Sequence, residues 1–129
     1  MKNIKSLAAG ALTAAAVLAP TAVAQADTPY AQASVRVASD GRTVGAALNV
    51  ISTSRLRTGI YCVNLNENVM LRGPEAIHAT PVGVYPAPRW LSIINAKECG
   101  KPDRGVTIAV RSINPEGQTR DVAFYFSVS

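Results

Sequence analysis

The stretch that decides the fold is VTIAVRSINPEGQTRDVAFYFSV, residues 106–128. Apolar and polar side chains alternate with a period of two on both sides of an Asn-Pro-Glu-Gly sequence at residues 114–117. Such alternation is typical of strands with one buried face, and Pro and Gly in these places favour a type I turn. The stretch therefore predicts two strands joined as a β-hairpin.

The same alternation continues towards the N-terminus. Tyr61, Val63 and Leu65 share one face of an expected strand, and Cys62 and Asn64 lie on the opposite face. Further strands are expected at residues 34–37, 44–51, 60–65 and 90–94, with a turn-bearing connector at residues 55–59 and polar segments at residues 64–68 and 95–104. No segment after residue 27 has the apolar period of a helix. The chain is therefore expected to be all-β, forming a small antiparallel β-sandwich or a partly closed barrel.

The middle of the chain is rich in proline. Residues 74–88 hold four prolines, and proline cannot donate a hydrogen bond to a strand ladder. This stretch is therefore expected to be an edge strand or an extended loop. Within residues 79–90 lie Tyr85, Arg89 and Trp90, residue types that are enriched at binding hot spots, on a stiff segment that loses little entropy when it docks.

Two interpretations of that segment follow. In the first, Tyr85, Arg89 and Trp90 bind a partner. In the second, the segment crosses between the two sheets and Trp90 fills the core. The second is favoured because Trp90 is the only tryptophan of a chain with few aromatic residues.

The N-terminus has the three parts of a secretory signal peptide. Two lysines precede an apolar run at residues 7–20, and Ala24-Gln25-Ala26 is a small-x-small cleavage site. A membrane anchor is the alternative, but the apolar run is shorter than the roughly 20 residues that span a bilayer. We therefore expect residues 1–26 to be removed and residues 27–129 to form a single secreted domain without a membrane span.

Cys62 and Cys99 are the two cysteines of the chain. In an exported protein, an even pair of cysteines is typical of a disulfide. A Cys62–Cys99 bond would close a loop of 37 residues. The alternative is two free thiols, one of which could act as a nucleophile.

The charge balance argues against one class of partner. The chain has 13 Lys and Arg residues against 8 Asp and Glu residues, and loss of the two leader lysines lowers the formal net charge from +5 to +3. The cations are scattered along the sequence, whereas a nucleic-acid-binding protein clusters them. We expect no nucleic-acid partner.

Chemistry-bearing motifs are scarce. His78 is the only histidine and is expected to be an exposed loop residue. No Gly-x-Ser-x-Gly elbow, phosphate-binding glycine loop or metal-ligand spacing accompanies it, and the acidic residues lie mostly in expected turns. The sequence therefore predicts no catalytic residue, no metal site and no cofactor.

Three stretches, residues 37–42, 50–63 and 106–128, resemble a short all-β domain that recurs in secreted actinobacterial proteins and at the ends of tail-fibre-like or collagen-like chains. Arg-Leu-Arg-Thr-Gly-Ile-Tyr at residues 55–61 is similar to its Arg-Leu-x-x-Gly-x-Tyr signature. In that domain the cysteines usually follow the tyrosine strand and close the chain end, whereas here Cys62 comes directly after Tyr61. The resemblance implies an all-β fold and an actinobacterial source, and implies little about activity.

These observations rank three functions. The first is a secreted, non-enzymatic binding or structural module, whose partner is a protein or a cell-envelope component and which could also form a homo-oligomer. The second is an inhibitor of a protease or another enzyme that uses the proline-rich loop at residues 79–90. The third is a small hydrolase or toxin, for which the sequence offers no site.

Overall fold

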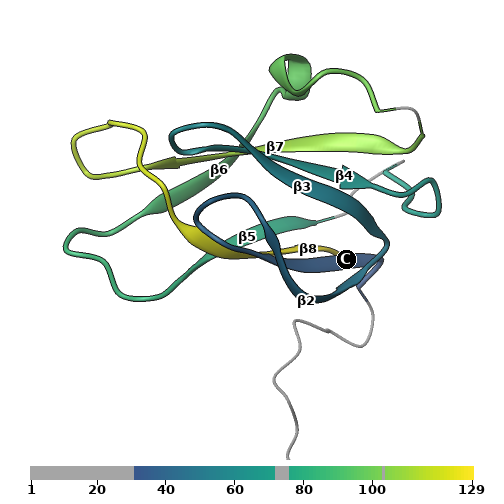
Figure 1. The fold of residues 1–129 in the computed structure, drawn as a ribbon, viewed down its shortest axis with the longest axis horizontal. Coiled ribbons are helices and arrows are strands. Elements are labelled where there is room, and N and C mark those ends of the chain that lie inside the picture. The colour runs from purple at the N-terminus through teal and green to yellow at the C-terminus, as the bar shows by residue number, and fades with distance from the viewer. Residues whose placement is uncertain (1–30, 72–75, 103) are drawn as a thin grey trace, which may run out of the picture.

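The computed structural model describes residues 31–71, 76–102 and 104–129 (Figure 1). The described chain forms strands and one short 3-10 helix. In order these are β1 (Ala33–Val37), β2 (Thr43–Leu48), β3 (Val50–Arg57), β4 (Ile60–Leu65), β5 (Ile77–Val82), β6 (Trp90–Ile94), η2 (Ala96–Cys99), β7 (Val106–Ile113) and β8 (Ala123–Val128). The predicted signal peptide at residues 1–26 lies outside the described residues. Among the described residues, no helix is long and apolar enough to cross a membrane.

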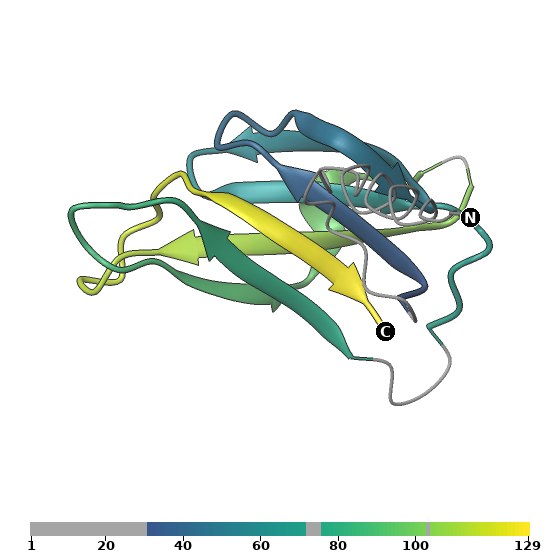
Figure 2. The ribbon, with the colours of Figure 1, turned by 90° about the horizontal axis from the view of Figure 1, so that it is seen from below.

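The strands form two antiparallel sheets of four strands each. Sheet A has the order β2-β1-β8-β5, and sheet B has the order β3-β4-β7-β6. The two sheets lie face to face (Figures 1 and 2), and they are not closed into a barrel. The prediction of an all-β sandwich is therefore confirmed.

The core lies between the sheets and consists of the inward members of the alternating runs. Val35 and Val37 of β1 and Phe124 and Phe126 of β8 face Tyr61, Val63 and Leu65 of β4, all with almost no exposed surface. Because successive side chains of a strand point to opposite faces, this set leaves Cys62 and Asn64 on the outer face of sheet B, as the sequence predicts.

The predicted hairpin of residues 106–128 is wrong. β7 pairs with β4 and β6 in sheet B, whereas β8 pairs with β1 and β5 in sheet A. The turn forms, since Gly117 N donates to Asn114 O, but the chain then continues to a buried Val122 and enters the opposite sheet. Alternation reports which face of a strand is buried and not which strand lies beside it, so two alternating runs around a turn also fit a crossover.

The expected strand at residues 44–51 is two strands. The chain turns at Asn49, whose φ of 52° lies in the left-handed region. Its side-chain Nδ2 donates to Gln32 O at 2.7 Å. β3 then runs on through Arg57, so the expected connector at residues 55–59 shrinks to a turn at Thr58 and Gly59. Small and β-branched residues occur on both sides of Asn49, so the sequence pattern does not show where the first strand ends and the second begins.

The proline-rich stretch holds an edge strand, as predicted, because β5 is the last strand of sheet A. Residues 83–89 then cross to β6 of sheet B, which confirms the inter-sheet crossover. The prediction that Trp90 fills the core is wrong, because 53% of this residue is exposed. Leu91 packs against the core, so its neighbour Trp90 points outwards, and Tyr85 of the crossover fills space beside the core instead.

A disulfide joins Cys62 to Cys99, as the sequence predicts, and leaves no free cysteine in the chain. Since Cys62 lies on the outer face of β4, the bond holds η2 on the outside of sheet B, where Figure 1 shows the helical turn above β7. An Arg57–Glu98 ion pair ties η2 to β3 as well, and the hydrogen bond from Arg57 lowers the pKa of Glu98.

Tyr61 joins the two sheets through its ring and its hydroxyl. The ring packs edge-on against Phe124, with centroids 5.1 Å apart. The hydroxyl donates to Ser39 O at 2.7 Å and accepts from the buried Val122 N at 3.0 Å. One side chain of sheet B therefore satisfies a backbone group just after β1 and another just before β8, at the same end of these two paired strands of sheet A.

We expect Tyr61→Phe to lower the free energy of unfolding by about 1–3 kcal/mol, because the buried Val122 N–H loses its acceptor. Urea unfolding followed by fluorescence measures this change. Tyr125→Phe is the matched control, since the Tyr125 hydroxyl makes no hydrogen bond within the described residues, and it should change stability by less than about 0.5 kcal/mol. Equal effects of the two substitutions would contradict this role of Tyr61.

We also expect loss of the disulfide to be costly. The chain-entropy model gives about 3–4 kcal/mol for the loop that the bond closes, so Cys62→Ala/Cys99→Ala should melt at least ~12 °C below the wild type. Differential scanning calorimetry of the oxidised wild type, the reduced wild type and the double variant separates the bond from the substitutions. Coincident melting curves for the oxidised and reduced wild type would refute the stabilisation.

Candidate functional site

Two of the three predicted partner-binding residues hold the shape of their own loop. The Tyr85 hydroxyl donates to Val82 O at 3.0 Å and accepts from Ala123 N at 2.9 Å. The Arg89 guanidinium lies 5.0 Å from the centroid of the Tyr85 ring and donates to Ala87 O at 2.9 Å. Both side chains are therefore committed to intramolecular contacts, and their contact with a partner stays a prediction.

Two large apolar side chains are exposed here, Val84 in the crossover and Trp90 at the start of β6. Val84 is 99% exposed, and it lies between Gly83 and the anchored Tyr85. A fully exposed apolar side chain on a braced loop is a feature that the sequence did not single out. The sequence feature that could have drawn attention to Val84 is its position between a glycine, Gly83, and a tyrosine, Tyr85.

No catalytic grouping surrounds the histidine among the residues that the structure describes. His78 is exposed, as predicted, although it lies on β5 rather than in a loop. Within the described residues it forms no hydrogen bond to a serine or a carboxylate. In the same part of the chain, no group of three or more His, Cys, Asp and Glu residues could hold a metal ion.

A polar cluster around Asp121 is the most connected set of side chains. Asp121 Oδ1 accepts from Gly59 N at 2.8 Å and from Arg55 Nε at 2.9 Å, and it lies 3.3 Å from the Tyr61 hydroxyl. Arg55 also donates to Thr58 Oγ1 at 3.0 Å. The cluster ties the β3–β4 turn to the crossover that precedes β8.

The electrostatics of this cluster fit a structural role. Burial alone would raise the pKa of Asp121, but the hydrogen bonds from Arg55 and Gly59 and the Arg55 charge outweigh it, so the pKa lies below its ordinary 3.8. Burial raises the pKa of Tyr61 to about 12, and the Asp121 charge adds to this. Asp121 is therefore ionised and Tyr61 is neutral at ordinary pH.

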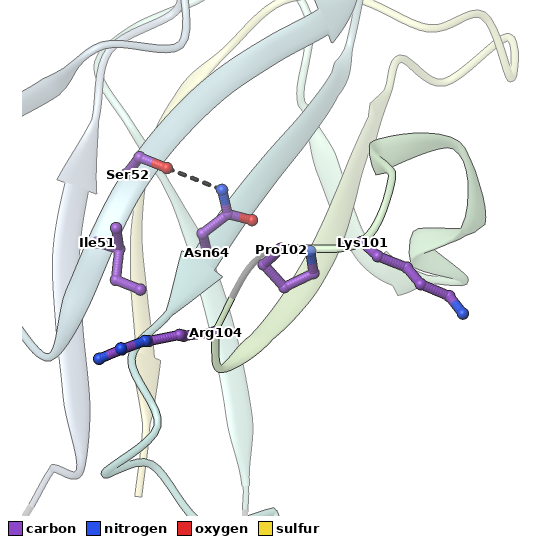
Figure 3. A pocket seen from close by; sticks show the side chains of 6 residues that line it. All are labelled: Ile51, Ser52, Asn64, Lys101, Pro102 and Arg104. Carbon is purple, nitrogen blue, oxygen red and sulfur yellow. Dashed lines mark hydrogen bonds between the residues drawn. The ribbon is translucent and has the colours of Figure 1, made fainter.

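One hollow lies on the outer face of sheet B. It has a volume of about 550 Å³ and is lined by Ile51, Ser52, Asn64, Lys101, Pro102 and Arg104 (Figure 3). A second hollow of about 220 Å³ is lined by Ile51, Asn66, Glu67, Asn68 and Arg104. The two hollows share Ile51 and Arg104 and therefore lie side by side. We call these nine residues together the sheet B groove.

Two residues of the groove, Ser52 and Asn64, form its floor and belong to a row of polar side chains that crosses three strands. Ser52 of β3 lies opposite Asn64 of β4, which in turn lies opposite Thr107 of β7. Asn64 Nδ2 donates to Ser52 Oγ at 2.8 Å, as Figure 3 shows, and Thr107 Oγ1 donates to Asn64 Oδ1 at 2.6 Å. Both bonds fix the orientation of the Asn64 amide.

One wall of the groove comes from the segment between η2 and β7. The disulfide holds this segment at Cys99. At its other end Gly105, with a φ of 78°, lies so close to β4 that an added Cβ would stand 1.9 Å from Leu65 O. Lys101, Pro102 and Arg104 stand between these two fixed points.

Among the described residues of the wall, Lys101 and Arg104 carry positive charges. Ion pairs in the described parts of the chain join Arg42 to Asp40, Arg55 to Asp121 and Arg57 to Glu98, so neither Lys101 nor Arg104 belongs to one of them. In Figure 3 the Arg104 side chain extends beneath Ile51, whereas Lys101 extends outwards from the rim.

The sequence contained part of this site. Alternation places Asn64 on the outer face with Cys62, and the polar segments at residues 64–68 and 95–104 supply most of the lining. What the sequence lacked was the strand register that aligns Ser52, Asn64 and Thr107, and the position of the second polar segment over that row.

No family model, curated protein or solved structure matches the chain. The resemblance of its motifs to the short all-β domain therefore stays a prediction.

Proposed function

We propose that this protein is a secreted, non-enzymatic binding module that holds a component of the cell envelope in the sheet B groove. The observation that carries the proposal is the prearranged floor of Ser52 and Asn64, which Thr107 holds from the next strand, beside a wall whose described residues include two cations. Binding sites combine a concave surface with a few convergent polar groups held in place before the ligand arrives. The polar groups of this groove meet that description.

The chemistry of the remaining clusters supports binding rather than catalysis. Asp121 Oδ1 accepts hydrogen bonds from Arg55 and Gly59, and His78, on an edge strand, forms no hydrogen bond to a serine or a carboxylate among the described residues. A general base has to lie within hydrogen-bond reach of the group that it activates. In the described chain, no pair of groups meets this requirement next to a hollow.

We expect the protein to co-sediment with cell-envelope material of the bacterium that produces it. Ser52→Trp should weaken this binding at least tenfold, because an indole on the floor fills the groove. The full chain is expressed with its own leader, and the purified product is titrated against washed envelopes.

Thr80→Trp is the matched control, since it places the same side chain on an exposed position of β5 in sheet A. It should bind as the wild type does, and melting curves show whether both variants fold. Absence of binding, or binding that Ser52→Trp leaves intact, would count against the proposed function.

A second function, inhibition of an extracellular protease by the loop at residues 79–90, is favoured by one observation. Val84 is fully exposed at a loop that Tyr85 and Arg89 brace from within. Against it, Gly83 has a φ of 105°, so the backbone bends immediately before Val84 instead of offering the extended strand that adds to an enzyme's sheet edge.

The inhibitor function predicts that the protein inhibits subtilisin or papain at an equimolar ratio, that Val84→Asp abolishes the inhibition, and that Ser52→Trp leaves it unchanged. Residual protease activity on a chromogenic peptide measures it. Cleavage within residues 80–90 without inhibition would remove this function.

A further inference from the structure

We propose that the ligand of the sheet B groove is an acidic glycan, an oligosaccharide that bears carboxylate or phosphate groups. This inference rests on the proposed function, because it names the ligand of the same groove. Three features carry it: a guanidinium that lines both hollows and has no ion-pair partner among the described residues, amide groups with spare hydrogen-bonding capacity, and apolar surface beside them.

Arg104 is the anion-binding element. It lines both hollows and belongs to none of the ion pairs among the described residues. A guanidinium presents five N–H donors in a planar fork that matches carboxylate and phosphate oxygens. Lys101 adds a second positive charge at the rim, which strengthens the attraction for an anion that approaches.

Asn64 supplies the hydroxyl-binding element of the floor. Its amide has two donors and two acceptor lone pairs, and the bonds to Ser52 and from Thr107 use one of each. One N–H and one lone pair therefore remain, in an orientation that the floor fixes. A donor beside an acceptor is the arrangement that a sugar hydroxyl, itself donor and acceptor, can satisfy.

The apolar surface fits the carbon face of a sugar ring. Ile51 is 58% exposed although it is a large aliphatic residue, and Pro102 stands across the hollow from it (Figure 3). A ring that lies between them covers apolar area while its hydroxyls stay within reach of the floor. The groove thus offers apolar, amide and cationic contacts together.

The second hollow sets the direction of the ligand. Its wall includes the carboxylate of Glu67 beside Asn66 and Asn68. A carboxylate repels an anion and accepts from hydroxyls, so the acidic group of the ligand is placed towards Lys101 and Arg104, and neutral sugar units extend towards Glu67. Because the hollows lie side by side, the ligand spans more than one sugar unit.

The test uses defined probes and the purified full-chain product. Isothermal titration calorimetry measures the Kd of a galacturonic acid tetrasaccharide, a phosphorylated mannose tetrasaccharide, a neutral galactose tetrasaccharide and hexaglutamate, each at 50 and 300 mM NaCl. We expect at least one acidic tetrasaccharide to bind tenfold or more tightly than both the neutral one and hexaglutamate. The two acidic probes distinguish a carboxylate from a phosphate, and binding weakens at the higher salt concentration.

Variants identify the groups involved. Arg104→Gln should raise the Kd of the acidic probe at least tenfold, and Glu67→Gln should lower it about threefold because a repelling charge is removed. Arg36→Gln is the matched control, since Arg36 lies over the Tyr125 ring on sheet A, and it should leave the Kd unchanged. Melting curves of all three variants verify folding.

Each other outcome overturns the inference. Equal binding of neutral and acidic tetrasaccharides with no effect of Arg104→Gln refutes the acidic group, and hexaglutamate binding as tightly as the sugars refutes the glycan. Envelope binding without binding of any tetrasaccharide does the same. In all these cases the proposed function still stands if Ser52→Trp abolishes envelope binding, so the two failures are distinguishable.

Discussion

The covering of one sheet's apolar face by the other is the constraint on which the rest of the structure depends. The core is built mostly of valines, with Tyr61, Phe124 and Phe126 as its large side chains. Because neither sheet can bury its inner face alone, every inward position is committed to packing. Only the outer faces, the edge strands and the crossovers remain for recognition, which is why the candidate site lies on the outside of sheet B.

The same constraint explains what the sequence could predict. Period-two alternation identified the inner faces of β1, β4, β7 and β8 correctly, and two cysteines in an expected exported chain identified the disulfide. Alternation is a property of one strand, whereas pairing is a property of two. The sequence therefore gave the faces of β7 and β8 and misplaced them in one hairpin. Trp90 was misplaced because aromatic content predicts burial only on average, and the neighbouring Leu91 took the inward position.

The candidate site was less predictable than the fold for a related reason. Asn64 was placed on the correct face, but the row of Ser52, Asn64 and Thr107 exists only in the register of β3, β4 and β7. These residues are far apart in the sequence, and none belongs to a motif. Tyr85 and Arg89, whose types suggested binding, instead brace a crossover, because a proline-rich connector forms few backbone hydrogen bonds and needs side chains to hold it.

The two polar clusters of sheet B differ in what remains unsatisfied. Asp121 receives donors from Arg55 and Gly59, and so it neutralises the cation beside it and closes a turn. Arg104 lies on a wall with no such partner among the described residues, although the wall is fixed by Cys99 at one end and by the close approach of Gly105 at the other. A charge held in place by covalent and steric constraints, rather than by its own ion pair, keeps its hydrogen-bonding capacity for a ligand. Since a disulfide of this kind persists in oxidising surroundings, the crosslink that stabilises the domain and the wall that it anchors are maintained under the same conditions.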